Sequence, residues 1–136
     1  MPRHFSKLYY HLVFVTKYRE FMIAEYNEKL LHRFLWDKSI VIGAYPMMIN
    51  GMPDHVHILI KIKPVHNVSA IVKNLKGSSS RFMNDLSGNK NQFEWSRGFG
   101  AFTVSEKDID MISNYIRNQK EHHRSGKPSP DLEVEL

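Results

Sequence analysis

The spacing of hydrophobic and polar residues predicts seven elements of secondary structure. Aromatic and β-branched runs predict strands over residues 8–16, 40–49, 55–63 and 99–105. Apolar residues at helical spacing predict helices over 25–38, from Asn67 or Ser69 to about Arg81, and from Ser105 to about His123. We expect Ser105 to cap the last helix, with Asp108 completing a capping box. Residues 50–54 and 86–92 are typical of a turn and a loop.

The order of these elements is β-α-β-β-α-β followed by a helix, which is the order of the ferredoxin-like α+β fold. We expect a single domain over residues 1–136, with a core at about 5–124 and a C-terminal tail at 125–136. Two helices should cover one face of an antiparallel sheet and leave the other face open. Open sheet faces of this kind often bind nucleic acid.

The composition narrows the class of partner. The chain has 136 residues, a net charge of +5 and a pI of about 9.5, which favours polyanions. It contains no cysteine, which excludes disulfides and thiolate metal sites. The longest early apolar stretch, residues 8–15, is too short to span a membrane and is not followed by a small-residue cleavage site. We therefore expect a cytoplasmic protein without a membrane segment.

Two histidines open the predicted strand 55–63. Side chains alternate between the two faces of a strand. The predicted core face carries Val56, Ile58, Ile60 and Ile62, and the open face carries His55, His57, Leu59 and Lys61. At this spacing both imidazoles can reach one metal ion. Two exposed histidines on a half-solvated sheet would give the same pattern.

A divalent ion at this position would need a third ligand. The candidates in the chain are Asp54, Glu94, Glu106, Glu121, His122, His123 and Gln119. Asp54 alternates to the opposite face of the strand, so we expect it to orient a histidine rather than to bind the ion.

The last predicted helix carries a tyrosine and a glutamine beside its apolar stripe. Ile109, Ile112 and Ile116 form the stripe, and Tyr115 and Gln119 lie one turn apart on its flank. A boundary tyrosine and an ordinary surface glutamine would fit the same spacing. Beside a metal held by two imidazoles and an amide oxygen, however, the tyrosine could attack a phosphate and form a phosphotyrosine ester.

Several motifs together resemble the HUH (histidine-hydrophobic-histidine) single-tyrosine transposases of the IS-two-hundred-like bacterial insertion sequences. The motifs are VFVTKYR (13–19), PDHVHIL (53–59), LKGSSSRF (75–82), the block WSRGFGAFTVS (95–105) and YIRNQKEHH (115–123). They occur in the order and at the spacing of that family, over about residues 5–124.

This resemblance implies His55, His57 and Gln119 as ligands of Mg²⁺ or Mn²⁺, and Tyr115 as the nucleophile. The implied substrate is single-stranded DNA with hairpins near the ends of the element. Cleavage would leave a 5′-phosphotyrosine and a free 3′-OH, and strand transfer would rejoin the ends. The resemblance also implies a homodimer, in which the tyrosine helix of one subunit can complete the site of the other.

Basic and hydroxyl side chains in these motifs predict contacts with DNA. The residues are Lys17, Arg19, Lys73, Lys76, Ser79, Arg81 and Arg97. Each lysine taken alone could also be a solvated surface charge. Trp95 could stack on a base or anchor the core. Phe99 stands where we expect a tyrosine in many relatives.

Two other functions are compatible with the sequence. One is a domesticated HUH endonuclease that processes chromosomal hairpin repeats. The other is a non-catalytic module that binds single-stranded nucleic acid. The presence of His55, His57, Tyr115 and Gln119 together argues against the second, because binding alone does not require all four.

Overall fold

The computed structural model describes residues 5–88 and 92–124. The strands are β1 (Leu8–Val15), β2 (Tyr45–Met52), β3 (His55–Ile62) and β4 (Gly100–Val104). The α-helices are α1 (Glu25–Val41), α2 (Val68–Leu86), α3 (Ile109–Arg117) and α4 (Gln119–Arg124). Short 3-10 turns lie at Lys17–Arg19 and Glu106–Asp108.

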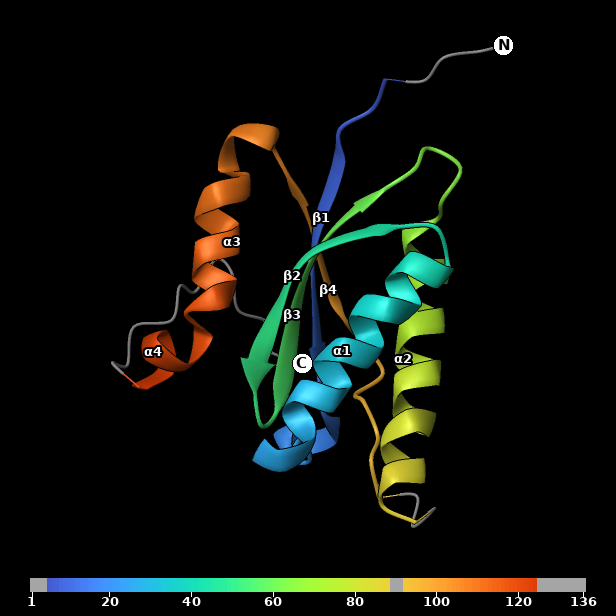
Figure 1. Ribbon diagram of the computed structural model, residues 1–136, viewed down its shortest axis with the longest axis vertical. Coiled ribbons are helices and arrows are strands. Elements are labelled where there is room, and N and C mark those ends of the chain that lie inside the picture. Colours follow the sequence, from blue (N-terminus) through green and yellow to red (C-terminus); the bar gives the residue numbers. More distant parts are fainter. Residues whose placement is uncertain (1–4, 89–91, 125–136) are drawn as a thin grey trace.

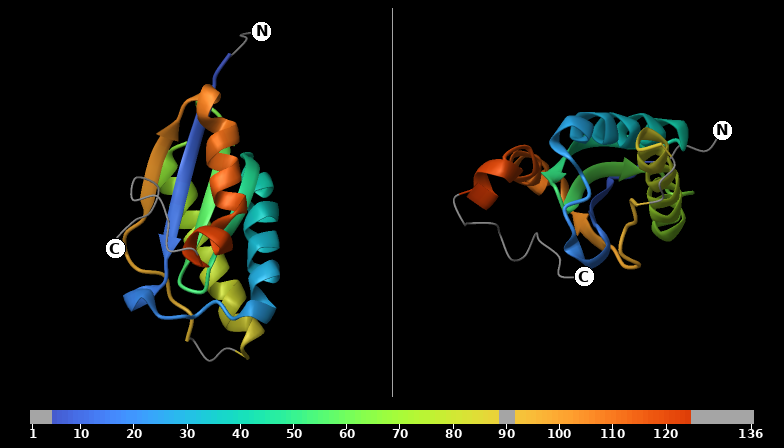
Figure 2. Two further views of the ribbon diagram at one scale, coloured as in Figure 1. Left: turned by 90° about the vertical axis from the view of Figure 1, so that its left-hand side faces the viewer. Right: turned by 90° about the horizontal axis from the view of Figure 1, so that it is seen from below.

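The four strands form one antiparallel sheet in the order β2-β3-β1-β4 (Figure 1). Helices α1 and α2 lie on one face of this sheet, and α3 and α4 lie on the other (Figures 1 and 2). The topology confirms the predicted ferredoxin-like α+β fold with an additional helical segment at its C-terminal end. Within the described ranges, no helix has the length and apolar character needed to cross a membrane.

The face of the sheet opposite α1 and α2 is not open around β3. A second apolar cluster lies between the sheet and α3, formed by Leu59, Val104, Ile112 and Ile116. In the left view of Figure 2, α3 lies over this face, while β1 and β4 remain visible beside it. Leu59 shares a face with the two histidines and gives α3 an apolar surface to bury. The expectation of an open face is therefore wrong for the part of the sheet around β3.

The second strand begins at Tyr45 rather than at residue 40. Helix α1 continues through Ile40 and Val41, and Gly43 follows it with a φ of +89°. Glycine adopts this left-handed conformation readily and often ends helices. The β-branched residues before it therefore belong to the helix, although on their own they favour a strand.

The other two predicted helices differ from the structure at their ends. Helix α2 is capped by Asn67, whose side chain accepts a hydrogen bond from the Ala70 N–H, and it continues beyond Arg81 to Leu86. The predicted helix from Ser105 is divided into a 3-10 turn, α3 and α4. Its capping box does not form among the described residues, because the Ser105 carbonyl, not its hydroxyl, accepts from the Asp108 N–H at 2.9 Å.

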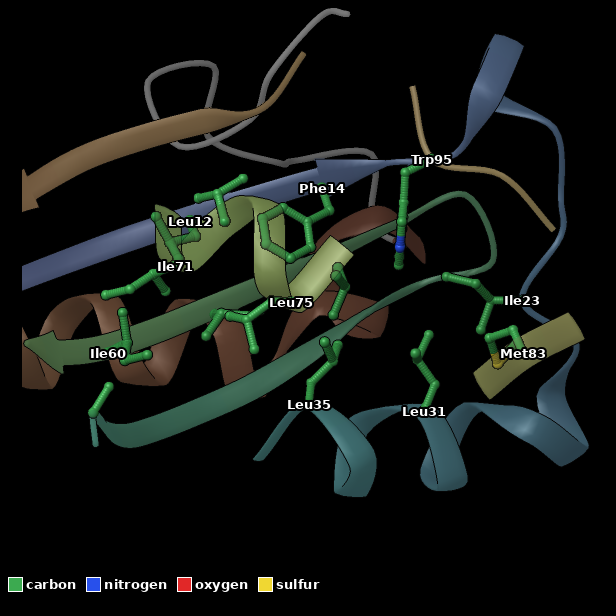
Figure 3. Close-up of a cluster of buried hydrophobic side chains, with 14 of the residues drawn as sticks. Leu12, Phe14, Ile23, Leu31, Leu35, Ile60, Ile71, Leu75, Met83 and Trp95 are labelled. Carbon is green, nitrogen blue, oxygen red and sulfur yellow. The ribbon is translucent and has the colours of Figure 1, made fainter. Parts of the chain in front are cut away.

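The main core lies between the sheet and helices α1 and α2 (Figure 3). The predicted core face of β3 is confirmed, because Val56, Ile58, Ile60 and Ile62 are all buried there. The helices contribute buried leucines, namely Leu31 and Leu35 of α1 and Leu75 of α2.

Trp95 is part of this core. Its ring packs edge-on against Phe14, and its indole N–H donates to Ser79 Oγ at 2.9 Å. Only 6% of its surface is exposed. Of the two roles considered for Trp95, the structure supports the core anchor.

Candidate functional site

The two histidines of β3 are buried beneath the C-terminal helices. His55 and His57 lie on the same face of the strand, and their ring centroids are 5.0 Å apart in an edge-to-face arrangement. Burial follows from the position of α3 and α4 over this face. Buried imidazoles need polar partners, and the partners of each ring decide which nitrogen it can offer to a ligand.

Asp54 provides the partner of His55. The Nδ1 of His55 donates to Asp54 Oδ1 at 2.7 Å, which leaves the lone pair of His55 Nε2 for another contact. Arg19 Nη1 lies 3.6 Å from Asp54 Oδ2. Partial burial acts to raise the pKa of Asp54, but its hydrogen bond and charge interaction with His55 and the charge of Arg19 outweigh this, so the pKa lies below its ordinary value. Asp54 is therefore placed where the sequence predicted it, beside a histidine.

Gln119 approaches His55 from the first residue of α4. Its Oε1 lies 3.2 Å from His55 Nε2, and the side chain is fully buried. With the Nδ1 proton of His55 given to Asp54, His55 Nε2 and Gln119 Oε1 are both acceptors in this orientation of the amide, and a shared cation would satisfy both. The amide Nε2 of Gln119 has no hydrogen-bond partner among the described residues, so no donor contact accounts for the orientation of the amide.

The geometry of this contact fits a shared divalent cation. Two adjacent ligands of an octahedral ion at about 2.1 Å are about 3.0 Å apart, close to the separation of His55 Nε2 and Gln119 Oε1. Imidazole nitrogen and amide oxygen include no soft ligand that would select zinc strongly. The residues present therefore fit an ion of the Mg²⁺ or Mn²⁺ type.

Tyr115 lies beside the histidines of its own chain. Its ring is buried, and its centroid is 6.1 Å from that of His57 in an edge-to-face arrangement. Tyr115 belongs to α3 and Gln119 to α4, and Asn118 separates the two helices with a φ of −98° and a ψ of 25°. The structure therefore brings together all four residues that the sequence predicts for the site.

Contacts from α1 and β2 fix the junction between α3 and α4. The Asn50 side chain donates from Nδ2 to the carbonyl of Arg117 at 2.9 Å, near the end of α3. The Lys120 ammonium forms an ion pair with Glu28 of α1 and donates to the Gly51 carbonyl at 3.2 Å. Because Lys120 follows Gln119 directly, these contacts also set the position of the buried amide.

The other candidate ligands lie elsewhere or have other partners. Glu94, Glu106 and Glu121 form ion pairs with Lys17, Lys7 and Arg124, respectively. The His123 ring is 5.1 Å from that of His55, whereas the side chain of His122 lies outside the described residues. In the described part of the chain, no three His, Asp or Glu side chains form a metal-binding group, whereas the Gln119 amide oxygen lies 3.2 Å from His55 Nε2.

The predicted DNA-contact residues do not form one surface. Lys17, Arg19 and Arg97 lie around the end of β1, the end of the sheet where His55 is located. Lys73 and Arg81 are exposed on α2, which covers the opposite face of the sheet.

Two of these predicted DNA contacts have structural roles instead. The Lys76 ammonium donates to the carbonyls of Ser96, Arg97 and Gly98 at 2.6, 3.3 and 3.0 Å, and partial burial lowers its pKa. Ser79 is fully buried against Trp95. Neither side chain is available to a phosphate in this arrangement.

His11 of β1 is a site residue that the sequence analysis missed. Its Nε2 lies 2.7 Å from His57 Nδ1, and both rings are fully buried. The contact depends on the pairing of β1 with β3, which places Val13 opposite His57 and Leu59 opposite His11. The sequence does show a histidine within the first predicted strand, which could have suggested a role for His11. It does not show which strand lies next to this one, so it could not place His11 beside His57.

Comparison with known proteins shows the family of the chain. Residues 4–119 match the family described as "Transposase IS200 like". The chain is 32% identical over 129 residues to the transposase for insertion sequence element IS200 of Salmonella typhimurium, covering 87% of this chain and 80% of that protein. It is 31% identical over 121 residues to the ISDra2 transposase TnpA of Deinococcus radiodurans, covering 83% of this chain and 84% of that one.

Two solved structures share the fold. A transposase crystal structure from Deinococcus radiodurans has 31% sequence identity and a TM-score of 0.69, covering 88% of this chain and 98% of that one. The REP-associated tyrosine transposase bound to a REP hairpin has a TM-score of 0.64 at 15% identity, covering 93% of this chain and 73% of that one, and supports the fold alone. On the family match and the two sequence relatives, this chain belongs to the IS200-like transposase family.

Proposed function

We propose that the protein cleaves and rejoins single-stranded DNA at hairpin-bearing ends of an insertion sequence, with Tyr115 as the nucleophile. The observation that carries this proposal is the convergence of Tyr115 and Gln119 with His55 and His57, which are about sixty residues away in the chain. A non-catalytic binding module would have no need to bury this set of polar side chains together. Family membership supports DNA transposition as the process in which the site acts.

In the proposed reaction, the Tyr115 hydroxyl attacks the scissile phosphorus. A bond forms between Tyr115 Oη and phosphorus, and the bond between phosphorus and the 3′ oxygen breaks. The Tyr115 proton leaves the phenol, and the departing oxygen takes up a proton to become a 3′-OH. The phosphate stays on the 5′ side as a phosphotyrosine. Attack on this ester by another 3′-OH reverses the step and restores the tyrosine, so no ATP is needed.

His55, His57 and Gln119 would hold Mg²⁺ or Mn²⁺ beside the phosphate. Such an ion supplies charge neutralisation and polarises the phosphate. Asp54 orients His55 for this task, and the Lys120–Glu28 ion pair holds the start of α4, and so Gln119, against the sheet.

The covalent adduct provides the decisive test. A labelled hairpin oligonucleotide carrying single-stranded flanks is incubated with the protein and MnCl₂, and the protein–DNA adduct is detected on a denaturing gel. We expect Tyr115→Phe to abolish the adduct and to leave hairpin binding intact, because only the hydroxyl is removed. Tyr9→Phe is the matched control, since Tyr9 packs against the same apolar cluster under α3 and should leave adduct formation unchanged. An adduct formed by Tyr115→Phe would contradict the assignment.

We further propose a homodimer, and the location of Tyr115 beside its own histidines supports cleavage by residues of one subunit. Mixing Tyr115→Phe with His57→Ala tests this. If each site is complete within a subunit, the mixture forms no adduct. If the tyrosine serves the partner's histidines, mixed dimers recover part of the activity.

A further inference from the structure

His11 and His57 form a pair of buried, nearly coplanar rings that meet edge to edge between two neighbouring strands. Their centroids are 4.9 Å apart with an interplanar angle of 21°, in addition to the 2.7 Å contact between His11 Nε2 and His57 Nδ1. Phe102 of β4 lies next to His11, with its ring centroid 5.9 Å away. His11 is thus held between a predicted metal ligand and an aromatic ring.

The proton between the two rings decides what His57 can bind. A neutral imidazole carries one ring proton, and the contact uses a proton from only one of the two partners. For His57 to offer its Nε2 lone pair to a metal, its own proton must be on Nδ1, and His11 Nε2 must accept it. In the opposite arrangement His57 carries its proton on Nε2, which prevents coordination through that atom.

We infer that His11 is a positioning residue that holds His57 in its metal-binding tautomer and ring orientation, an inference that rests on the proposed metal site. The two ligands then have different supports. His55 donates to the carboxylate of Asp54, which adds negative charge near the cation, whereas His57 donates to a neutral ring, which adds orientation without charge. Such supporting contacts are generally worth about 10- to 100-fold in metal affinity.

The inference can be tested without any reaction, by titrating the protein with MnCl₂ in a calorimeter. We expect His11→Phe, which keeps the ring but removes the acceptor, to weaken Mn²⁺ binding by about 10- to 100-fold. His11→Gln can place an amide oxygen near the position of Nε2 and should bind Mn²⁺ close to the wild-type affinity. His11→Asn is too short to reach His57 and should resemble His11→Phe.

Imidazole nitrogen NMR provides the second readout, because it reports the tautomer of His57. The proton should be on Nδ1 in the Mn²⁺-free wild type and in His11→Gln. Equal Mn²⁺ affinity in wild type, His11→Gln and His11→Asn would overturn the role of His11, even if His11→Phe did not fold. Absence of Mn²⁺ binding by the wild type would instead refute the proposed metal site itself.

A separate observation concerns the backbone directly after β1. Tyr18 and Arg19 both have a left-handed conformation, with φ of 58° and 54°. Non-glycine residues adopt this conformation at an energetic cost, and consecutive examples persist where neighbouring contacts fix them. Buried Thr16 supplies those contacts, because its N–H donates to the Asp54 carbonyl at 2.9 Å and its hydroxyl to the Glu20 carbonyl at 2.6 Å. The Tyr18 side chain in this segment is 80% exposed.

The exposed Tyr18 borders a hollow of about 380 Å³ at this end of the sheet. Its lining residues are Lys17, Tyr18, Glu94, Trp95, Ser96 and Arg97. Lys17 Nζ lies 5.4 Å from the centre of the Tyr18 ring and 3.1 Å from Glu94 Oε2, and Arg97 is exposed. An aromatic platform, cationic groups and a carboxylate acceptor match the stacking, phosphate and amino-group features of a single-stranded nucleotide.

The hollow lies close to the candidate active site. Val15, the last residue of β1, is opposite His55 in the sheet, and Arg19 contacts Asp54. We propose that the hollow binds one nucleotide of the single-stranded DNA beside the cleaved phosphate, with its base against Tyr18. This proposal rests on the proposed substrate class.

Fluorescence anisotropy with a labelled, short single-stranded oligodeoxycytidylate, whose bases carry an amino group, in metal-free buffer tests the hollow. We expect Tyr18→Ala to weaken binding by about 5- to 100-fold, as for the loss of one stacked base, and Tyr18→Phe to retain it. Tyr45→Ala is the matched control, because Tyr45 is 56% exposed and has Lys63 Nζ 5.9 Å from its ring, but lies at the opposite end of β3. Equal affinities of Tyr18→Ala and Tyr45→Ala would overturn the proposal. Failure of the wild type to bind would refute the substrate class instead.

Discussion

The two faces of the sheet are buried in different ways. The face under α1 and α2 is covered by hydrocarbon, with Leu12, Phe14 and Ile60 packed against leucines of the helices. The face under α3 combines a small apolar cluster with buried histidines, a tyrosine and a glutamine. Apolar burial stabilises the fold, whereas buried polar groups must be matched by partners and are costly if they are not. We conclude that the first face mainly stabilises the fold, whereas the second also holds the buried polar side chains of the candidate site.

The largest expected effect is the loss of stability when a buried leucine on either face is replaced by alanine, and comparing one leucine from each face separates the two roles. Leu75→Ala in the main core and Leu59→Ala under α3 should each lower the free energy of unfolding by about 2–5 kcal/mol, because both side chains are fully buried. Only Leu59→Ala should also weaken Mn²⁺ binding and adduct formation, because it removes apolar packing between the sheet and α3. Urea denaturation and MnCl₂ titration measure the two effects. Equal loss of Mn²⁺ affinity in both variants would remove the distinction between the faces.

The second prediction concerns His32, which lies on α1 near the ion pair that joins α1 to α4. Burial, together with the charge of Lys120, lowers its pKa from 6.5 to about 4 against the opposing effect of Glu28. As the pH falls from 6.5 to 4, the unfolded chain takes up this proton and the folded protein does not. The contribution of His32 to the free energy of unfolding should therefore be fully present above pH 6.5. It should decrease by at most about 3 kcal/mol as the pH falls from 6.5 to 4.

Denaturation curves measured between pH 7 and 4 test this contribution of His32. The variant His32→Gln should flatten the pH dependence, because it has no proton to bind. His66→Gln serves as the control, since His66 lies in the turn after β3, away from the ion pair. An unchanged slope in His32→Gln would show that other groups cause the loss of stability.

The smallest expected change in stability comes from breaking the ion pair that holds α4 against α1, and it tests whether this contact positions Gln119. Lys120→Met removes the ion pair with Glu28 and should cost about 1 kcal/mol, because the lysine is partly exposed. Lys120→Met should weaken Mn²⁺ binding more than its small effect on stability would suggest, because Lys120 directly follows the proposed ligand Gln119. Arg124→Met removes an exposed ion pair within the same helix and should change neither quantity measurably. If Lys120→Met binds Mn²⁺ as well as Arg124→Met does, the junction does not position Gln119.

Local sequence patterns correctly predicted most of the helices and strands, and on which face of its strand or helix each key residue lies. Strand alternation correctly placed Val56 in the core and His57 on the opposite face, and helical spacing placed Tyr115 beside Ile112 and Ile116. These features depend on a few neighbouring residues, for which period and spacing are reliable guides. Family resemblance then connected the histidine strand to the tyrosine helix, which no local pattern could do.

Three of the missed features depend on contacts between distant segments. His11 acquires its role only when β1 pairs with β3, and Lys76 loses a phosphate-binding role because carbonyls of residues 96–98 surround its ammonium. The covered face has the same origin, since Leu59 becomes buried only when α3 folds back onto the sheet. Long-range packing of this kind is not encoded in the spacing of a single segment.

The interruption at Asn118 divides Tyr115 and Gln119, two residues of the candidate site, between two helices. Tyr115, the proposed nucleophile, belongs to α3, whereas Gln119 belongs to α4, which is anchored separately to α1 and β2 through Lys120. A change in backbone angles at this one residue would shift Tyr115, together with any DNA strand joined to it, while Gln119 stayed against His55. In the proposed reaction, α3 would therefore move with the attached DNA strand while His55 and Gln119, the proposed metal ligands, kept their positions.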